Sequence, residues 1–274
     1  MKYSMSNLCG FFTRTRQAFY KTVQHNLERE LLEQKILDEV QRIRVRQPRV
    51  GTRKLHRMIK ERLQTAGIAV GRDHLFALLR ARNLLIRRRR HGKQTTDSRH
   101  RLKKYSNLIR DLDLTRANQL HVSDITYIAT QEGFCYLALI TDAYSRKIVG
   151  YDLSRSLSLE GSYRALQMAL SKLSGPLNLI HHSDRGLQYC SQAYVELLTK
   201  NGIRISMTEE QHVYENAKAE RVNGILKHEF LLGEVLASFE VAQKLVAEAI
   251  QIYNEERLHL SLNYQTPATV HAAK

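Results

Sequence analysis

The sequence predicts an α/β fold, a mixed five-stranded sheet with helices, preceded by an all-α region. Two changes near residue 118 predict this division. The first is in hydrophobic period: upstream, apolar residues recur every three or four positions, as along one face of a helix. Downstream, short runs rich in Val, Ile, Tyr and Thr alternate with helical segments. The chain of 274 residues is long enough to bury a sizeable core.

The second change is in charge. Residues 1–118 hold 29 Lys and Arg against 10 Asp and Glu, whereas residues 119–274 hold 14 against 17. The formal net charge of +16 therefore comes from the N-terminal part. A nucleic acid is the expected partner of that part, through phosphate contacts and counterion release. A lysine-rich soluble surface is the alternative, but it would spread the charge evenly.

The cysteines and the hydropathy exclude several classes of protein. Cys9, Cys135 and Cys190 are far apart and form no Cys-x-x-Cys pair, so neither a disulfide framework nor a structural zinc site is indicated. The first twenty residues lack the apolar core of a signal peptide, and no apolar run approaches the roughly 18 residues of a membrane span. We expect a soluble, intracellular protein with no membrane partner.

Three helices are expected in the basic region. The first covers residues 28–46 and stops before Pro48, the second begins with Thr52 as its N-cap, and residues 66–71 break it. The third begins at about Arg72. Helix, short glycine-containing turn and helix form the helix-turn-helix pattern, whose second helix enters the major groove of DNA. Any small helical bundle gives the same pattern.

Basic side chains on the third helix and just after it are the candidate DNA contacts. Adjacent guanidinium groups repel one another unless phosphates neutralise them, although a solvated charge run is the alternative. The candidates are Arg72, His74, Arg80, Arg87, Arg88, Arg89 and Arg90. We therefore expect a helix-turn-helix-like DNA-binding region over 1–90, a basic linker over 91–117, and a catalytic core with C-terminal helices over 118–274.

The core begins with a three-stranded meander, after which helices and strands alternate. The expected bounds are 120–129, 134–141 and 147–153 for the strands of the meander, then 159–173, 177–182, 191–200, 203–207 and 214–231. Three strands, then alternating helix and strand, then helices, is the order of the ribonuclease-H-like fold. The sequence contains no internal repeat.

Three carboxylates stand out within this order. Asp124 lies in the apolar run of the first strand, Asp184 follows the fourth strand, and Glu220 lies on the long helix. Each has an ordinary alternative: a solvated edge residue, a turn former or a helix surface charge. Together they describe a two-metal phosphoryl-transfer site, where two Mg²⁺ ions, with Mn²⁺ as a substitute, clamp the attacking and leaving oxygens.

A basic residue accompanies the third acid. Lys227 is seven positions after Glu220, and seven steps of about 100° return to nearly the same helix face. An acid for metal and a base for phosphate, aligned at this offset, suit a helix that acts on DNA.

These segments resemble the integrase-core DDE transposases, specifically the insertion-sequence transposases of the IS3 family. The resemblance covers nearly the whole chain and is strongest in Val122-Ser-Asp-Ile-Thr-Tyr127, Asp142-Ala-Tyr-Ser-Arg-Lys-Ile-Val-Gly150, His182-Ser-Asp-Arg-Gly186, Glu215-Asn-Ala-Lys-Ala-Glu220, Leu226-Lys-His-Glu229 and Tyr253-Asn-Glu-Glu-Arg257. Upstream, Gly51-Thr-Arg-Lys-Leu55 and Leu84-Leu-Ile-Arg-Arg88 resemble the DNA-binding region of the family. His121 stands where the family usually has Trp, and residues 208–213 are more acidic than is usual.

The resemblance implies roles for particular residues. Asp124, Asp184 and Glu220 would hold the metal ions, and Lys227 would contact DNA near the ends of the element. Asn216 and His182 are candidates for groups that support the acids from behind. His181 and His182 could be read as extra metal ligands, but we favour a supporting role at the end of the strand. Tyr253, Arg257 and His259 are equally suited to packing or to DNA contact.

The resemblance also implies a function. The implied protein would be a bacterial DNA transposase, nucleoid-associated in the cytoplasm, that binds terminal inverted repeats and catalyses metal-dependent 3′-end cleavage and strand transfer into target DNA. A homo-oligomer is expected, since two ends must be held together, and a first-frame partner or fusion is possible. Two alternatives stay open: a structure-specific nuclease of the same fold, and a non-catalytic DNA-binding regulator of transposition.

Overall fold

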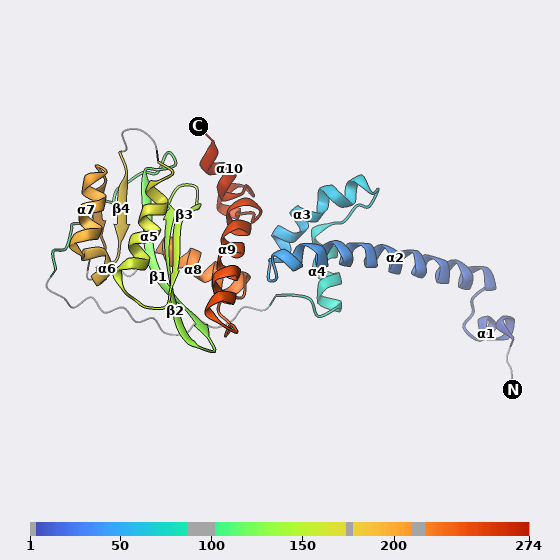
Figure 1. Cartoon of the computed structure of the whole chain (residues 1–274). Coiled ribbons are helices and arrows are strands. Elements are labelled where there is room, and N and C mark those ends of the chain that lie inside the picture. The colour runs from blue at the N-terminus through green and yellow to red at the C-terminus, as the bar shows by residue number, and fades with distance from the viewer. Residues whose placement is uncertain (1–3, 87–101, 174–177, 210–216, 274) are drawn as a thin grey trace. The chain divides into compact units, whose positions relative to one another are not determined.

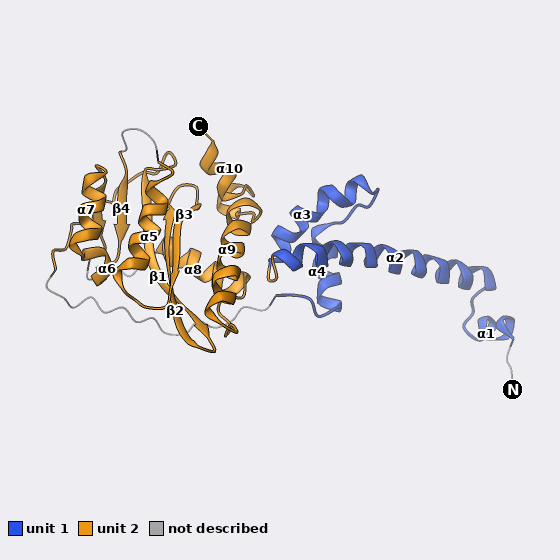
Figure 2. Cartoon of the chain, viewed as in Figure 1, with its two compact units in different colours: residues 1–46, 50–86 blue, residues 47–49, 87–274 orange. Residues whose placement is uncertain are grey.

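The computed structural model describes residues 4–86, 102–173, 178–209 and 217–273. The chain divides into two compact units (Figure 2), of which the first comprises residues 1–46 and 50–86, and the second residues 47–49 and 87–274. No helix in the described ranges is long and apolar enough to cross a membrane.

Unit 1 is entirely helical in its described part. Its helices are α1 (Met5–Phe11), α2 (Arg16–Arg46), α3 (Thr52–Thr65) and α4 (Arg72–Ala81). One apolar cluster joins the C-terminal half of α2 to α3 and α4, with Ile36, Leu55 and Leu79 fully buried. The all-α character expected of this region is therefore confirmed. The expected cap is wrong: Gly51 is the N-cap of α3, and Thr52 is the first helical residue.

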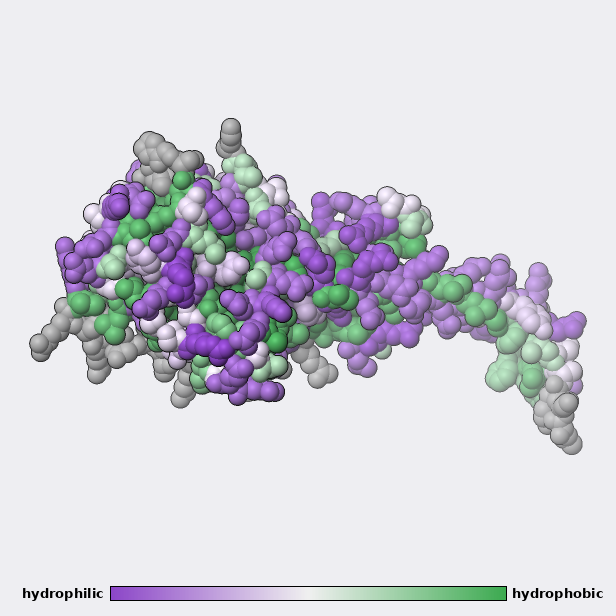
Figure 3. Space-filling model, viewed as in Figure 1, coloured by the Kyte–Doolittle hydropathy of each residue, from purple (hydrophilic) through white to green (hydrophobic). Residues whose placement is uncertain are grey.

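The helix α2 begins at Arg16, well before the expected start at residue 28. Its added turns, with Leu31 just after them, expose a row of apolar side chains, which is visible along the helix in Figure 3. The exposed residues are Phe19, Tyr20, Val23, Leu27 and Leu31. Sequence periodicity missed these turns because their apolar residues continue no face of the buried cluster of unit 1.

Unit 2 contains a five-stranded sheet in the order β3-β2-β1-β4-β5 (Figure 1). The strands are β1 (Leu120–Thr130), β2 (Gly133–Asp142), β3 (Ile148–Ser154), β4 (Ile180–Ser183) and β5 (Arg204–Met207). The first three form an antiparallel meander, while β4 runs parallel to both β1 and β5. The mixed five-stranded sheet is as the sequence predicts.

Helices cover both faces of this sheet (Figure 1). On one face, α5 (Leu159–Leu170), α6 (Leu187–Cys190) and α7 (Gln192–Lys200) bury a cluster around Ile140, Leu166 and Tyr194. On the other, α8 (Ala217–Glu229) and α9 (Phe239–Glu255) pack on Ile128 and Leu137. A short 3₁₀ helix (Leu260–Leu262) and α10 (Pro267–Ala272) follow α9.

Part of the expected linker packs against the core. Ile109, Leu112 and Leu114 pack on a cluster with Leu120, and the backbone N–H of Leu108 donates to Ser206 Oγ at 2.9 Å. Three apolar residues without a regular period gave too weak a pattern for this docking to be expected. The rest of the expected linker, up to residue 101, lies outside the described residues.

Candidate active site

Asp124 lies in the middle of β1, opposite Leu139 of β2. Alternation along the strand puts its carboxylate on the face covered by α8. There the side-chain amide of Asn223 donates to Asp124 Oδ2 at 2.7 Å. Asp124 is thus a partly buried acid whose orientation is fixed by a neighbouring helix.

Asp184 is brought beside Asp124 by the parallel pairing of β1 with β4. Val122 is level with His182 in this register, so the chain places Asp184 level with Asp124 just after β4 ends. The turn that follows is tight: the N–H of Gly186 donates to Asp184 Oδ1 at 2.9 Å. A Cβ at Gly186 would lie 3.0 Å from that oxygen, so the turn has little room for a larger residue.

Glu220 lies in the first turn of α8 and completes the acidic group. Burial, the charge of Asp184 and, more weakly, the charge of Glu220 together raise the pKa of Asp124 to about 7. Hydrogen bonds from the backbone of Ile125 and from Asn223 act in the opposite direction. The structure therefore brings the three predicted acids within electrostatic reach of one another.

A divalent cation fits the chemistry of this group. Carboxylate and amide oxygens are the hard ligands that Mg²⁺ prefers, and a cation would offset the burial and the repulsion that raise the pKa of Asp124. Asn223 Oδ1 is buried beside Asp124 without a hydrogen-bond donor in the described residues. However, no group of three or more His, Cys, Asp and Glu side chains in those ranges is close enough together to hold a metal ion. The donor types fit a metal ion, while their spacing is not that of coordination.

Lys227 lies on the last turns of α8, half-buried. Burial lowers its pKa, and the nearby charge of Asp124 counteracts that effect. The basic residue predicted to share a face with Glu220 is thus near the acidic group.

The two histidines before Asp184 are fully buried. His182 Nδ1 lies 2.9 Å from Ser206 Oγ on β5, and His181 Nε2 lies 3.0 Å from the hydroxyl of Tyr194 on α7. Burial lowers the pKa of His181 to about 3, so its ring is neutral. These contacts favour a role in supporting the strand.

The predicted DNA contacts divide into two groups. Arg72, His74 and Arg80 are exposed on α4, where Arg72 Nε forms an ion pair with Asp73 at 2.9 Å. Arg87, Arg88, Arg89 and Arg90 lie outside the described residues, as does Asn216.

Sequence analysis missed Asn223, whose side chain contacts Asp124 directly. Its position was a usable signal, because it follows Glu220 by three residues and precedes Lys227 by four. Both spacings put side chains on one helix face.

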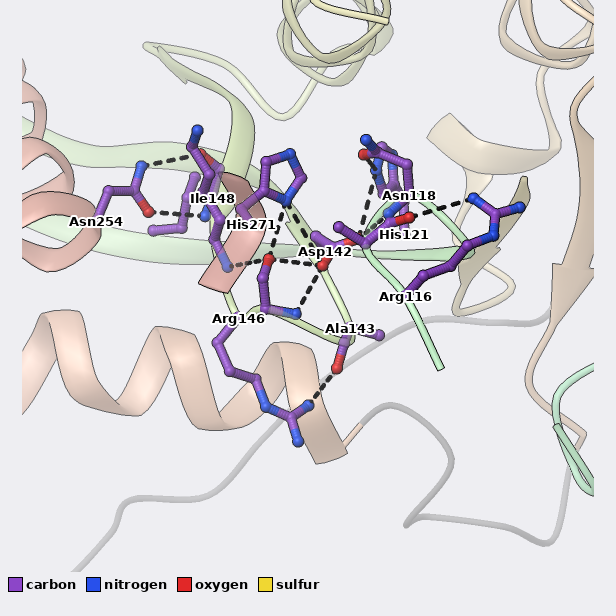
Figure 4. A network of polar contacts seen from close by, with 12 residues as sticks. Arg116, Asn118, His121, Asp142, Ala143, Arg146, Ile148, Asn254 and His271 are labelled. Carbon is purple, nitrogen blue, oxygen red and sulfur yellow. Dashed lines mark hydrogen bonds and ion pairs between the residues drawn. The ribbon is translucent and has the colours of Figure 1, made fainter. Parts of the chain in front are cut away.

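A separate polar cluster surrounds Asp142 at the end of β2 (Figure 4). Asp142 Oδ1 accepts from the N–H of Ser145 at 2.7 Å and from its hydroxyl at 2.6 Å. Ser145 Oγ lies 3.0 Å from His271 Nδ1 on α10. The same histidine nitrogen also faces Asp142, so the three do not form a nucleophile–base–acid relay. The cluster holds α10 against the sheet.

Three C-terminal residues were expected either to pack against the fold or to contact DNA. Tyr253, Arg257 and His259 are all buried. Arg257 forms a bidentate ion pair with Glu229, with nitrogen–oxygen distances of 2.9 and 2.7 Å. Their positions favour packing over DNA contact.

The sheet order, the three acids on β1, after β4 and on α8, and the flanking helices define an integrase-type catalytic core. Two family models, each described as an integrase core domain, match residues 115–212 and 201–267. Among solved structures, the chain is similar to a simian T-cell lymphotropic virus intasome in complex with a PP2A regulatory subunit, with a TM-score of 0.50 and 17% identity. That likeness covers 82% of this chain and 75% of the other, and it concerns the fold.

Curated relatives narrow the class further. The chain is 36% identical over 265 residues to the insertion element IS600 uncharacterized 31 kDa protein of Shigella sonnei, covering 95% of this chain and 96% of that protein. It is 34% identical over 203 residues to the transposase InsF for insertion sequence IS3fB of Escherichia coli, covering 73% and 70%. The chain belongs to the IS3-family transposases, and it is a DDE-type polynucleotidyl transferase.

Proposed function

We propose that this transposase binds the terminal inverted repeats of an insertion sequence, cleaves the 3′ ends and joins them to target DNA, using Asp124, Asp184 and Glu220. The observation that carries the proposal is that Asp184 and Glu220 lie within electrostatic reach of the buried Asp124, whose pKa burial and their charges raise, and that Lys227 is near the same acid. Three acids from separate elements would not be gathered in a partly buried site without a cation to stabilise them.

Each residue then has a role. The acids would hold two Mg²⁺ ions, or Mn²⁺ in their place, which activate the attacking oxygen and stabilise the leaving one. Asn223 holds the carboxylate of Asp124 in a fixed orientation. Lys227 contacts a backbone phosphate near the scissile bond. No covalent protein intermediate is needed.

The test uses the purified full chain with labelled element ends and Mg²⁺ or Mn²⁺. Joined products on a gel are expected, and Asp184→Asn should abolish both cleavage and joining while leaving end binding intact. Full activity of that variant would overturn the assignment. Cut-only products would indicate a structure-specific nuclease, and shifted complexes without cleavage would indicate a regulator.

Lys227 is tested separately from the acids. Lys227→Ala should reduce cleavage of the ends and weaken DNA binding near them, while Mn²⁺ binding without DNA stays unchanged. Lys244→Ala, on the exposed surface of α9, is the control that removes one positive charge elsewhere. If the two variants had equal effects, Lys227 would act only through the net charge of the protein and not through a specific contact with DNA.

The chain is proposed to consist of a DNA-binding region over residues 1–90, a linker over 91–117 and a catalytic core over 118–274. The DNA-binding region would bind DNA independently of the catalytic core. Exposure of Arg72, His74 and Arg80 on α4 supports this role. Arg72→Ala with Arg80→Ala should weaken DNA binding and make its salt dependence shallower, because each lost phosphate contact reduces counterion release. The same test applies to the run from Arg87 to Arg90.

The transposase is proposed to act on DNA as an assembly of at least two copies, with a first-frame partner or fusion as a further component. Its proposed location is the bacterial cytoplasm, in association with the nucleoid. The exposed apolar row on α2 supports association between copies. Leu27→Glu should lower the mass of the complex with paired ends, as measured by light scattering. An unchanged mass would exclude the row as the contact.

A further inference from the structure

Tyr189 is a fully buried residue on α6, five positions after Asp184. Its hydroxyl accepts a hydrogen bond of 3.1 Å from Ser123 Oγ. Ser123 is also buried and is the residue before Asp124 on β1. Tyr189 therefore touches the backbone segment that carries the first acid.

On its other side, Tyr189 adjoins the turn that carries the second acid. The N–H of Tyr189 donates to the carbonyl of Gly186 at 3.1 Å, and the N–H of Gly186 donates to Asp184 Oδ1. A Cβ at Gly186 would lie 3.0 Å from Asp184 Oδ1 and 3.6 Å from Tyr189 Cδ2, so the carboxylate and the ring flank the same side of this glycine. A short series of contacts thus runs from Asp184 through Gly186, Tyr189 and Ser123 to Asp124.

The surroundings fix the Tyr189 ring and keep its hydroxyl neutral. The ring makes an edge contact with Tyr194 at a centroid distance of 5.4 Å. Burial raises the pKa of Tyr189 well above its usual value, and the charges of Asp184 and Asp124 add to the shift. A rigid neutral hydroxyl in this position serves as a hydrogen-bonding spacer behind the two carboxylates.

We infer that Tyr189 is a positioning residue, whose hydrogen bond to Ser123 sets the spacing between Asp124 and Asp184 and thereby their affinity for a divalent cation. This inference rests on the proposed function, since it assigns those two acids to the metal. The hydroxyl is separated from the acids by the strand and the turn, so Tyr189 acts through their backbones. Groups that orient metal ligands from behind change metal affinity about 10- to 100-fold when removed.

The test measures Mn²⁺ binding to the full chain by electron paramagnetic resonance, without DNA. Tyr189→Phe should weaken binding about tenfold. The matched control is Tyr253→Phe, which removes another buried hydroxyl in unit 2, one that donates to the carbonyl of Arg146 at 3.0 Å. Both variants should lower Tm similarly, and only Tyr189→Phe should weaken Mn²⁺ binding. Unchanged binding in Tyr189→Phe, or equal weakening in both variants, would overturn the inference.

Ser123→Ala provides an independent approach if Tyr189→Phe folds poorly. It removes the other partner of the same hydrogen bond and should also weaken Mn²⁺ binding. The double variant should bind Mn²⁺ with the same affinity as the single variant that binds it less tightly, because one interaction is lost only once. Additive losses would contradict a shared role. Asp184→Asn separates the two proposals: if it binds Mn²⁺ as the unmodified protein does, the metal-site assignment itself fails, whatever the result for Tyr189.

Discussion

The side-chain amide of Asn223 donates a 2.7 Å hydrogen bond to Asp124 Oδ2 and so joins α8 to the central strand of the sheet. Because Glu220 and Lys227 lie on the same helix, this single bond links the orientation of α8 to that of the first acid. Asn223 is a residue to which the sequence alone assigned no role.

Replacing Asn223 with Ala should lower strand cleavage by about 10- to 100-fold and raise the Mn²⁺ concentration needed for half-maximal activity. The physical reason is that Asp124 then loses the bond that orients it. A matched control is Asn254→Ala on α9, which removes amide contacts of 2.9 and 3.0 Å to the backbone of Ile148. That control should lower Tm without shifting the Mn²⁺ requirement; a shift in both variants would assign the effect of Asn223 to general stability.

The raised pKa of Asp124 makes the metal-free protein less stable as the pH rises. Its pKa is about 7 in the folded protein and about 4 in the unfolded chain, so folding favours the protonated form. The stability present below pH 4 is lost as the pH rises to about 7. Asp124→Asn should therefore raise the free energy of unfolding at pH 8 by up to about 4 kcal/mol, and hardly change it at pH 4.

The measurement is the difference in Tm between this variant and the unmodified protein, in the presence of a chelator and across that pH range. This difference gives the contribution of Asp124 to the pH dependence of stability, separate from that of other titrating groups. A constant difference would refute the shift. Adding Mn²⁺ should reverse the order of stability at pH 8, because the cation binds the ionised carboxylate of the unmodified protein.

The ion pair between Arg257 and Glu229 should matter for stability. Arg257 is 4% exposed and makes two bonds to the carboxylate, so its replacement by Met leaves a partly buried charge without this bidentate partner. We expect a loss of about 3 kcal/mol in the free energy of unfolding. Arg155→Met, which removes an exposed residue paired with Glu132 and Glu240, should leave Tm nearly unchanged. Urea unfolding of both variants checks the contrast, and similar losses would contradict it.

Close packing of β3 against α5 depends on Gly150. A Cβ there would lie 2.1 Å from the carbonyl oxygen of Ala165, so Gly150→Ala must push strand and helix apart. We expect a loss of about 2 kcal/mol or more in the free energy of unfolding. Gly224→Ala is the contrast, because nothing lies within 4 Å of its added Cβ and alanine favours the helix by about 1 kcal/mol. Opposite shifts in Tm are expected; a loss at both positions would rule out the packing argument.

Much of the fold followed from period and turn signals. The strands of the meander end within about a residue of their expected bounds, because alternating apolar runs between polar turns specify such strands strongly. The start of α2 and the docking of Ile109 and Leu112 were missed. In both places the apolar residues are too few or too irregular to fix a face.

The sequence by itself predicted the chemistry that we propose for this protein, from three acids in a particular element order, a base seven residues after the last acid, and a basic N-terminal region. Only the tertiary structure decided how the acids are held. The pairing of β1 with β4, the bond from Asn223 to Asp124 and the contact of Tyr189 with Ser123 join residues tens of positions apart. Such contacts depend on how strands and helices pack, and local periodicity contains no information about them.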